Sequence, residues 1–191
     1  MNTQSEQHIL EQAAGLLAAV PYQRVTLEAV ADELNISMDE LLHHFPSMHS
    51  LGSAILTHEG ATMRKAQQRA EEETPDPLVR LHLAFRLVGR NLAVDPIVRA
   101  GIRIAAEAAP WFPERNINPF RTWEAFVTRN LDEANDAGLL KAGTDIASAS
   151  WLYVAAGMGT KDLLAFTGDW PSAEDKLATI SKIVIESIRQ Q

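Results

Sequence analysis

The sequence predicts an all-α protein. Apolar residues recur at three- and four-residue steps through most of the 191 residues, which is the spacing of one face of a helix. No segment alternates apolar and polar residues over the length of a strand. Proline, glycine and short polar runs divide the periodic pattern into about nine segments. Together these observations indicate a helical bundle of about nine helices joined by short connections.

Composition places the chain among globular proteins and excludes several kinds of chemistry. Hydrophobic residues make up 46% of the chain and charged residues 22%, which is ordinary for a folded domain. The absence of cysteine excludes disulfides, thiolate catalysis and zinc–thiolate sites. The start is polar and acidic without a signal region, and no apolar run approaches the roughly 20 residues of a membrane span. We therefore expect a cytoplasmic protein with no membrane partner.

The first third of the chain is expected to hold four helices. The first helix has an apolar face and ends before Pro21. Its apolar residues are Ile9, Leu10, Ala13, Leu16, Leu17 and Val20. Thr26 is expected to cap a second helix over residues 27–34, which Asn35 ends in the left-handed conformation.

The second and third helices together predict a helix-turn-helix. The segment Ser37-Met38-Asp39-Glu40 matches the capping-box pattern, so the third helix should begin there and run to about residue 44. Two short helices joined by residues 35–36 have the geometry in which the second helix enters the major groove of DNA. The alternative is a plain helical hairpin inside a bundle, and the spacing alone favours it.

Longer helices are expected further along. Ser47 can cap a fourth helix that runs to about residue 70, and a polar, proline-bounded connection should follow over residues 71–77. The remaining helices are expected at about 77–93, 96–109, 118–137, 144–167 and 172–190. An apolar stripe in the bundle core is expected from Trp151, Val154, Ala155, Met158 and Leu163. Trp111-Phe112-Pro113 is expected to be an exposed aromatic loop, either a pocket lid or ordinary loop packing.

Residues 9–51 carry a particular order of apolar, capping and turn residues. They are Ile9-Leu10, Ala13-Ala14, Leu17, Val25-Thr26-Leu27, Val30-Ala31, Leu34-Asn35-Ile36-Ser37, Leu41-Leu42, His44-Phe45, Pro46-Ser47 and Leu51. This order resembles the N-terminal region of the tetracycline-repressor (TetR) family. The resemblance implies a TetR-like fold, with a three-helix DNA-binding head over residues 1–50 and a helical ligand-binding and dimerisation domain over 51–191.

A second set of residues lies in the later helices. It comprises Asp95-Pro96-Ile97-Val98-Arg99-Ala100-Gly101-Ile102-Arg103, Trp123, Ala137-Gly138-Leu139-Leu140, Asp145, Ala156-Gly157, Leu163 and Thr167-Gly168. This set is similar to the γ-butyrolactone-receptor branch of the TetR family, whose members sense small lactones. The resemblance implies a ligand-responsive transcriptional regulator in which Trp123 faces a lactone-like or other apolar metabolite.

The resemblance also implies which residues of the head face duplex DNA. These are Arg24, Thr26, Ser37, Met38, Leu42, His43, His44, Ser47 and His49. Residues 1–60, however, hold one cation, Arg24, and eight carboxylates, whereas the other 131 residues hold 16 cations and 17 carboxylates. DNA affinity depends mainly on cations placed against phosphates. Two interpretations therefore stay open: a repressor with weak or unusual operator binding, and a head kept as a structural module without a DNA role.

Candidate ligand-binding residues come from several helices. They are Trp123, Phe126, Val127 and Asn130 on one helix, with Arg103, Met158, Lys161 and Asp162 from others. A buried indole N–H needs a partner, and a ligand carbonyl would serve Trp123. Core packing is the alternative for most of these residues. Arg103 could instead pair with Glu107, and Lys161 with Asp162, at the surface.

The sequence carries no nucleophile–base pair, phosphate loop or metal-ligand spacing, so no metal or cofactor is expected. The family resemblance implies a homodimer through the last two helices, 144–167 and 172–190. The alternative function is a TetR-fold protein that has lost DNA binding and uses the former ligand pocket to hold a small molecule, or as a biosynthetic enzyme.

Overall fold

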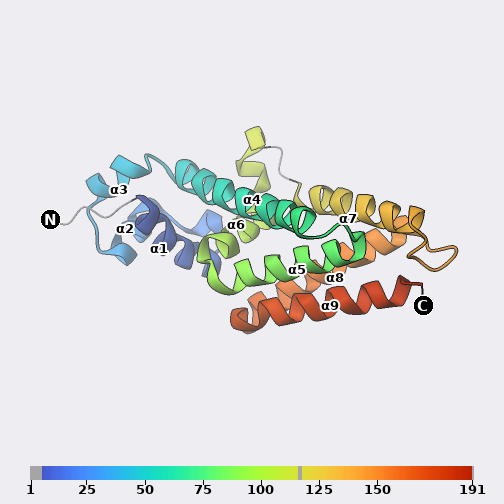
Figure 1. The fold of residues 1–191 in the computed structure, drawn as a ribbon. Coiled ribbons are helices and arrows are strands. Elements are labelled where there is room, and N and C mark those ends of the chain that lie inside the picture. The colour runs from blue at the N-terminus through green and yellow to red at the C-terminus, as the bar shows by residue number, and fades with distance from the viewer. Residues whose placement is uncertain (1–5, 116–117, 191) are drawn as a thin grey trace. The chain divides into compact units, whose positions relative to one another are not determined.

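The computed structural model describes residues 6–115 and 118–190 (Figure 1). The α-helices in this part are α1 (Glu6–Ala19), α2 (Leu27–Leu34), α3 (Met38–His44), α4 (Met48–Glu73), α5 (Pro77–Val94), α6 (Pro96–Glu107), α7 (Pro119–Asp136), α8 (Ile146–Thr167) and α9 (Ala173–Ile188). Short 3-10 helices lie at 22–24, 109–111, 113–115 and 170–172. Among these residues, extended pairing is limited to one bridge between Leu140 and Arg189. The predicted all-α class is confirmed.

The chain divides into two compact units. The first unit contains residues 1–62 and 95–118, and the second contains residues 63–94 and 119–191. Helix α4 is continuous, but its residues up to Thr62 belong to the first unit and the rest to the second. Helix α6 belongs with the N-terminal helices. The functional boundary expected at residue 50 remains a prediction, because it concerns DNA and ligand binding rather than compactness.

Hydrogen bonds and backbone angles confirm the predicted helix ends in the helix-turn-helix. Thr26 Oγ1 accepts a hydrogen bond from Ala29 N at 3.2 Å, and Ser37 Oγ accepts one from Glu40 N at 3.1 Å. Asn35 has φ 52° and ψ 44°, the left-handed conformation that ends α2. Ser47 Oγ accepts from Ser50 N at 3.0 Å at the start of α4. Local sequence chemistry therefore fixes where these helices begin and end.

The first unit has a single apolar core to which α6 contributes together with the head helices. Ile9 and Leu17 of α1 and Leu51 of α4 are fully buried, and Ile97 and Ile104 of α6 pack into the same cluster. Phe112, just after α6, is also fully buried. The three-helix head is thus completed by residues 97–112, which follow α4 and α5 in the chain.

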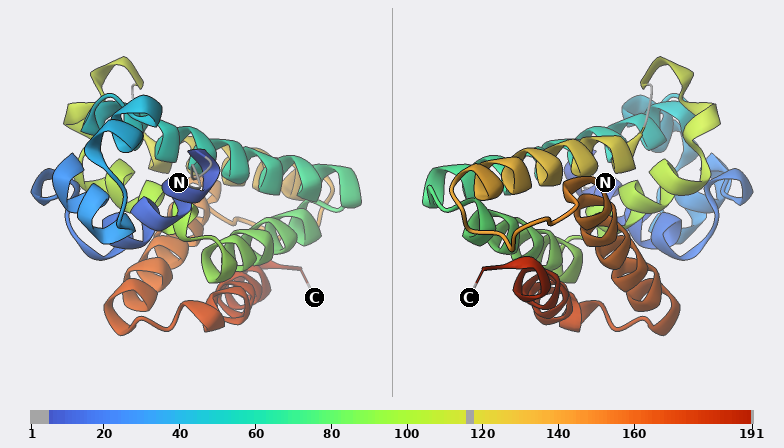
Figure 2. Two further views of the ribbon diagram at one scale, coloured as in Figure 1. Left: turned by 90° about the vertical axis from the view of Figure 1, so that its left-hand side faces the viewer. Right: turned by 90° about the vertical axis from the view of Figure 1, so that its right-hand side faces the viewer.

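The second unit is built from α5, α7, α8, α9 and the end of α4. Helices α5 and α9 run side by side (Figure 2). They approach closely at Gly89, where an added Cβ would lie 2.5 Å from the carbonyl oxygen of Ala173. Tyr153 of α8 is buried, and its hydroxyl is 2.5 Å from the Ser181 hydroxyl of α9. Burial raises the pKa of Tyr153, so the ring stays neutral.

Three expectations from the sequence are wrong. Residues 71–73 are the last turn of α4 rather than part of the connection, because nothing before Pro75 interrupts the helix. Phe112 is buried rather than exposed, although its neighbour Trp111 is 52% exposed. Trp151 and Leu163 of the expected core stripe are each 67% exposed. No helix among the described residues has both the length and the apolar character to cross a membrane.

Replacing Phe112 tests the core of the first unit. Phe112→Ala removes a fully buried ring and should lower the free energy of unfolding by about 3–5 kcal/mol, measured by urea denaturation. Trp111→Ala is the matched control, because it removes a larger but half-exposed ring from the adjacent position. Equal losses in the two variants would contradict the packing described here.

Candidate functional site

The helix-turn-helix is formed by α2 and α3, and α4 follows directly. Hydrogen bonds from Asn35 N to Asp32 O and from Ile36 N to Ala31 O close the turn between α2 and α3. Leu41 of α3 is buried, while Leu42 is 40% exposed and His43 is exposed. The outer face of α3 is thereby available to a partner, as expected of the second helix of a helix-turn-helix.

The hydroxyl groups predicted to contact DNA already accept hydrogen bonds at the starts of helices. Thr26, Ser37 and Ser47 each cap a helix with the side-chain oxygen. Their hydroxyls can still donate to a phosphate while the oxygen accepts, because a hydroxyl has one donor and two acceptor positions. Met38 packs partly against the core of the first unit. These residues could position α2 and α3 on a duplex, but they carry no charge.

The histidines predicted near DNA differ in their surroundings. The ring of His43 lies edge-on to that of His44 at 5.2 Å. Nε2 of His44 is buried and has no hydrogen-bond partner among the residues the structure describes. His49 Nε2 lies 3.1 Å from a Glu114 carboxylate oxygen, so this ring already has an acidic partner within the protein. His43 is thus exposed, whereas His49 is paired with a carboxylate of the protein.

Carboxylates dominate the surface of α2 and α3. Glu28, Asp32, Glu33 and Asp39 are all exposed, and Arg24 is the only cation in residues 1–60. Hydrogen bonds from its own backbone N–H and from the Thr26 side chain lower the pKa of Glu28. This keeps the carboxylate charged at the first turn of α2, where it also complements the helix dipole. Charge placement that stabilises the helices thus opposes phosphate binding.

The first half of α4 is braced by residues that follow α6. The Phe112 ring stacks on His49 at 5.0 Å and contacts Tyr22 at 5.3 Å. Gly52 makes room for this ring, since a Cβ there would lie 2.6 Å from Phe112 Cζ. Arg115 donates to Ser53 O at 2.7 Å and to Thr57 Oγ1 at 2.8 Å. The segment 112–115 therefore fixes the helix that directly follows α3.

A second contact fixes α4 to the start of α6. Asp95 caps α6 by accepting from Ile97 N and Val98 N through one carboxylate oxygen. Its other oxygen lies 2.7 Å from His58 Nε2 of α4. Close packing of Gly101 against Glu59 brings the two helices together there.

In the second unit, the predicted ligand-binding residues of α7 lie in an aromatic cluster. Trp123 lies edge-on to Phe85 of α5 at 5.9 Å and to Phe126 at 5.8 Å. Phe85 also contacts Tyr153 at 4.3 Å. Phe126 and Val127 are buried, whereas Trp123 is only partly buried. Such a cluster offers an apolar surface with one indole N–H, which suits a small apolar ligand carrying an acceptor.

Asn130 is fully buried, and its amide is engaged within the protein. Nδ2 donates to Phe126 O at 2.8 Å, and Oδ1 accepts from Arg80 of α5 at 2.9 Å. Arg80 also pairs with Glu133 at 2.7 Å and donates to the carbonyl of Pro75. Arg80 is thus the polar residue joining α5 to α7, and no local pattern predicts it because its side-chain partners Asn130 and Glu133 lie 50 and 53 residues away.

The other predicted ligand-binding residues do not lie in this aromatic cluster. Arg103 belongs to the first unit, where it pairs with Glu107 at 2.9 Å and donates to Ala18 O at 3.0 Å. Lys161 and Asp162 form an ion pair at 2.7 Å, with Lys161 largely covered and Asp162 exposed. Met158 is partly buried on the same helix. The structure therefore brings Trp123, Phe126, Val127 and Asn130 together, and their role toward a ligand remains a prediction.

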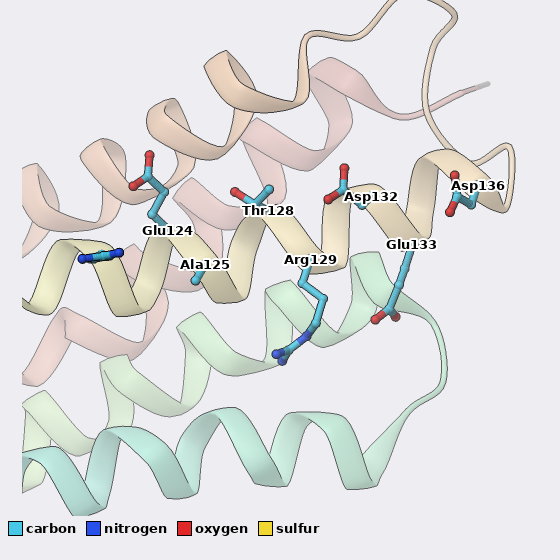
Figure 3. A pocket seen from close by; sticks show the side chains of 8 residues that line it. Glu124, Ala125, Thr128, Arg129, Asp132, Glu133 and Asp136 are labelled. Atoms are coloured by element: carbon cyan, nitrogen blue, oxygen red, sulfur yellow. The ribbon is translucent and has the colours of Figure 1, made fainter.

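An open hollow of about 580 Å³ follows the outer face of α7 (Figure 3). Its lining includes Glu124, Asp132 and Asp136, so it is acidic. The one central cation, Arg129, is paired with Glu71 of α4 and lies over the Phe126 ring. Trp123 does not line this hollow. It is a solvated helix face, distinct from the predicted lactone site.

Comparison with known proteins gives a family match to the N-terminal part of the chain and a relative that matches nearly all of it. Residues 9–55 match the family of bacterial regulatory proteins called tetR family. The nucleoid occlusion factor SlmA of Shewanella denitrificans is 26% identical over 187 residues, covering 90% of this chain and 93% of that protein.

Two solved structures illustrate the likeness in fold. The TetR family protein CprB from S. coelicolor A3(2) has a TM-score of 0.77 and 24% identity, covering 97% of this chain and 88% of that one. A γ-butyrolactone receptor, described as an ArpA-like protein, has a TM-score of 0.72 and 19% identity over 95% of both chains. At these identities the two structures establish the shared fold.

The fold and the site together define an all-helical helix-turn-helix protein with a helical second unit. The chain therefore carries a tetR-type N-terminal domain, and its fold is the TetR-like fold expected from the sequence.

Proposed function

We propose that this chain is a ligand-responsive transcriptional regulator that acts in the cytoplasm as a homodimer. In this proposal α3 enters the major groove of DNA, and a small lactone-like or other apolar metabolite binds beside Trp123. The observation that supports it most is the helix-turn-helix itself, with its caps at Thr26 and Ser37 and its family match. The γ-butyrolactone receptor of the same fold supports the ligand class.

The proposed coupling between ligand and DNA runs through α4. Its last turn is held to α7 by the ion pair between Glu71 and Arg129. Its first turns are braced by the Phe112 ring, which packs over Gly52 and stacks on His49. Because α4 is a continuous helix, a ligand that displaces α7 near Trp123 would also move the start of α4. Such a ligand shifts a two-state equilibrium only by its difference in affinity for the two states.

Binding of the chain to the DNA upstream of its own gene tests the regulator function. We expect sequence-selective binding that is weak and highly dependent on salt, because the head carries few cations. Fluorescence anisotropy at low salt measures it. Asp39→Lys should tighten binding by about tenfold, or roughly 1.4 kcal/mol. Asp132→Lys makes the same charge change on α7 and should have little effect.

The second candidate function is a TetR-fold protein that no longer binds DNA. The single cation among residues 1–60 favours it. In that case the pocket would hold a small molecule or catalyse a biosynthetic step. A folded, dimeric protein that shows no DNA binding at low salt, before and after Asp39→Lys, would exclude the regulator and leave this candidate.

Ligand binding beside Trp123 is tested with a γ-butyrolactone that carries an alkyl chain. The compound should raise the melting temperature of the wild-type protein, because it binds only the folded state. Trp123→Ala should abolish that rise while leaving the far-ultraviolet circular dichroism spectrum unchanged. Trp111→Ala, in the first unit, should keep it. A full response in Trp123→Ala would place the lactone site elsewhere.

The proposed dimer uses α8 and α9, which carry an exposed apolar face. Leu152, Gly159, Leu163 and Phe166 recur along one side of α8, and Phe166 is 90% exposed. Ile183 of α9 is also exposed. A contiguous apolar face of this kind is typical of an interface.

A charge on that face should dissociate the dimer. Phe166→Glu places two carboxylates at the proposed interface and should give a monomer in light scattering after size exclusion at micromolar concentration. Val94→Glu charges another highly exposed apolar residue, at the end of α5, and should remain dimeric. A dimer in both variants would contradict this interface.

A further inference from the structure

A second cavity lies in the groove between α5 and α9, apart from the aromatic cluster around Trp123. It has a volume of about 370 Å³. Its apolar wall is formed by Leu78 and Val79 of α5 and Ile185 of α9. Its polar wall is formed by His82, Lys182, Glu186 and Arg189. The cavity thus combines an apolar surface with two cations and one carboxylate.

The polar groups of this cavity are incompletely paired. Nδ1 of His82 is buried and has no hydrogen-bond partner among residues 6–115 and 118–190. A buried polar atom without a partner is costly and is uncommon in folded proteins. Lys182 pairs with Glu186 only at 3.8 Å. One carboxylate therefore faces two cations, and the cavity is net positive.

The backbone beside the cavity holds Arg189 in place. Residues on both sides of it pair with the segment that precedes α8: Lys141 N donates to Ile188 O at 2.9 Å, and Gln190 N donates to Leu139 O at 2.8 Å. Leu140 and Arg189 form the antiparallel bridge between the two segments. The guanidinium thus extends from a fixed point next to the groove.

We propose that this cavity binds an organic carboxylate with a short alkyl chain. The carboxylate would lie between Lys182 and Arg189 and within reach of the His82 ring, and the chain would lie on Leu78, Val79 and Ile185. Charge complementarity favours an anion, and the apolar wall favours an alkyl tail over an inorganic ion. This site is separate from the proposed lactone site and does not rest on it.

Binding at this site should depend on pH through His82. Burial, then the positive charges of Arg86 on α5 and Lys182 on α9, lower the pKa of His82, so the free protein holds it neutral. Glu186 and Arg189 are the other charged groups of α9 that line the cavity. A bound carboxylate adds negative charge beside the ring and raises its pKa. Binding then takes up a proton, and affinity increases as pH falls.

Calorimetric titration of the full chain with octanoate tests the site. We expect saturable binding, with octanol, which lacks the charge, binding at least about tenfold more weakly. Arg189→Gln and Lys182→Gln should each weaken octanoate binding by about tenfold, and Glu186→Gln should strengthen it. Lys176→Gln is the matched control, because it removes the same charge from an exposed position of α9 outside the cavity.

Two further variants distinguish this site from the lactone site and test whether His82 takes up a proton when octanoate binds. Trp123→Ala should leave octanoate affinity unchanged; its loss would assign octanoate to the aromatic cluster and overturn the proposal. Affinity of the wild type should rise between about pH 8 and about pH 6, and His82→Gln should remove that rise while retaining binding. Absence of saturable binding, or equal affinity in Arg189→Gln and wild type, would also overturn it.

Discussion

The burial of Phe112 is the contact on which the first unit depends. This ring fills the space above Gly52, lies against Tyr22 and stacks on His49. It thereby joins the helix that follows α3 to the segment that follows α6. The three-helix head would otherwise leave part of its apolar surface uncovered, because α6 supplies one side of its core. The position of α3 is consequently a property of the whole first unit.

Fold and charge are specified separately in the head. The helix ends depend on single side chains, such as Thr26 and Ser37, and on the left-handed conformation of Asn35. None of these requires a cation. A carboxylate in the first turn of a helix even stabilises it. The helix-turn-helix can therefore keep its shape while its surface becomes acidic, and a family match over residues 9–55 reports shape more directly than DNA affinity.

The features predicted correctly from the sequence are local ones. Caps, breaks and the period of apolar residues depend on neighbours within four positions, so the helices and the helix-turn-helix could be located. The burial of Phe112 could not, because the space it fills is made by Gly52, sixty positions earlier. Arg80 was missed for the same reason, since its partners Asn130 and Glu133 are on another helix. The exposed Leu163 was misassigned because an apolar stripe looks the same whether its own chain or a partner covers it.

Helix α5 links the features of the second unit. Phe85 faces Trp123 and Tyr153, and Gly89 allows α9 to approach. His82, less than one turn from Phe85, borders the cavity between α5 and α9. A ligand at the aromatic cluster and a carboxylate in the groove would thus contact the same helix, through residues three positions apart. If one ligand changes the affinity for the other through α5, the second ligand must change the affinity for the first by the same factor.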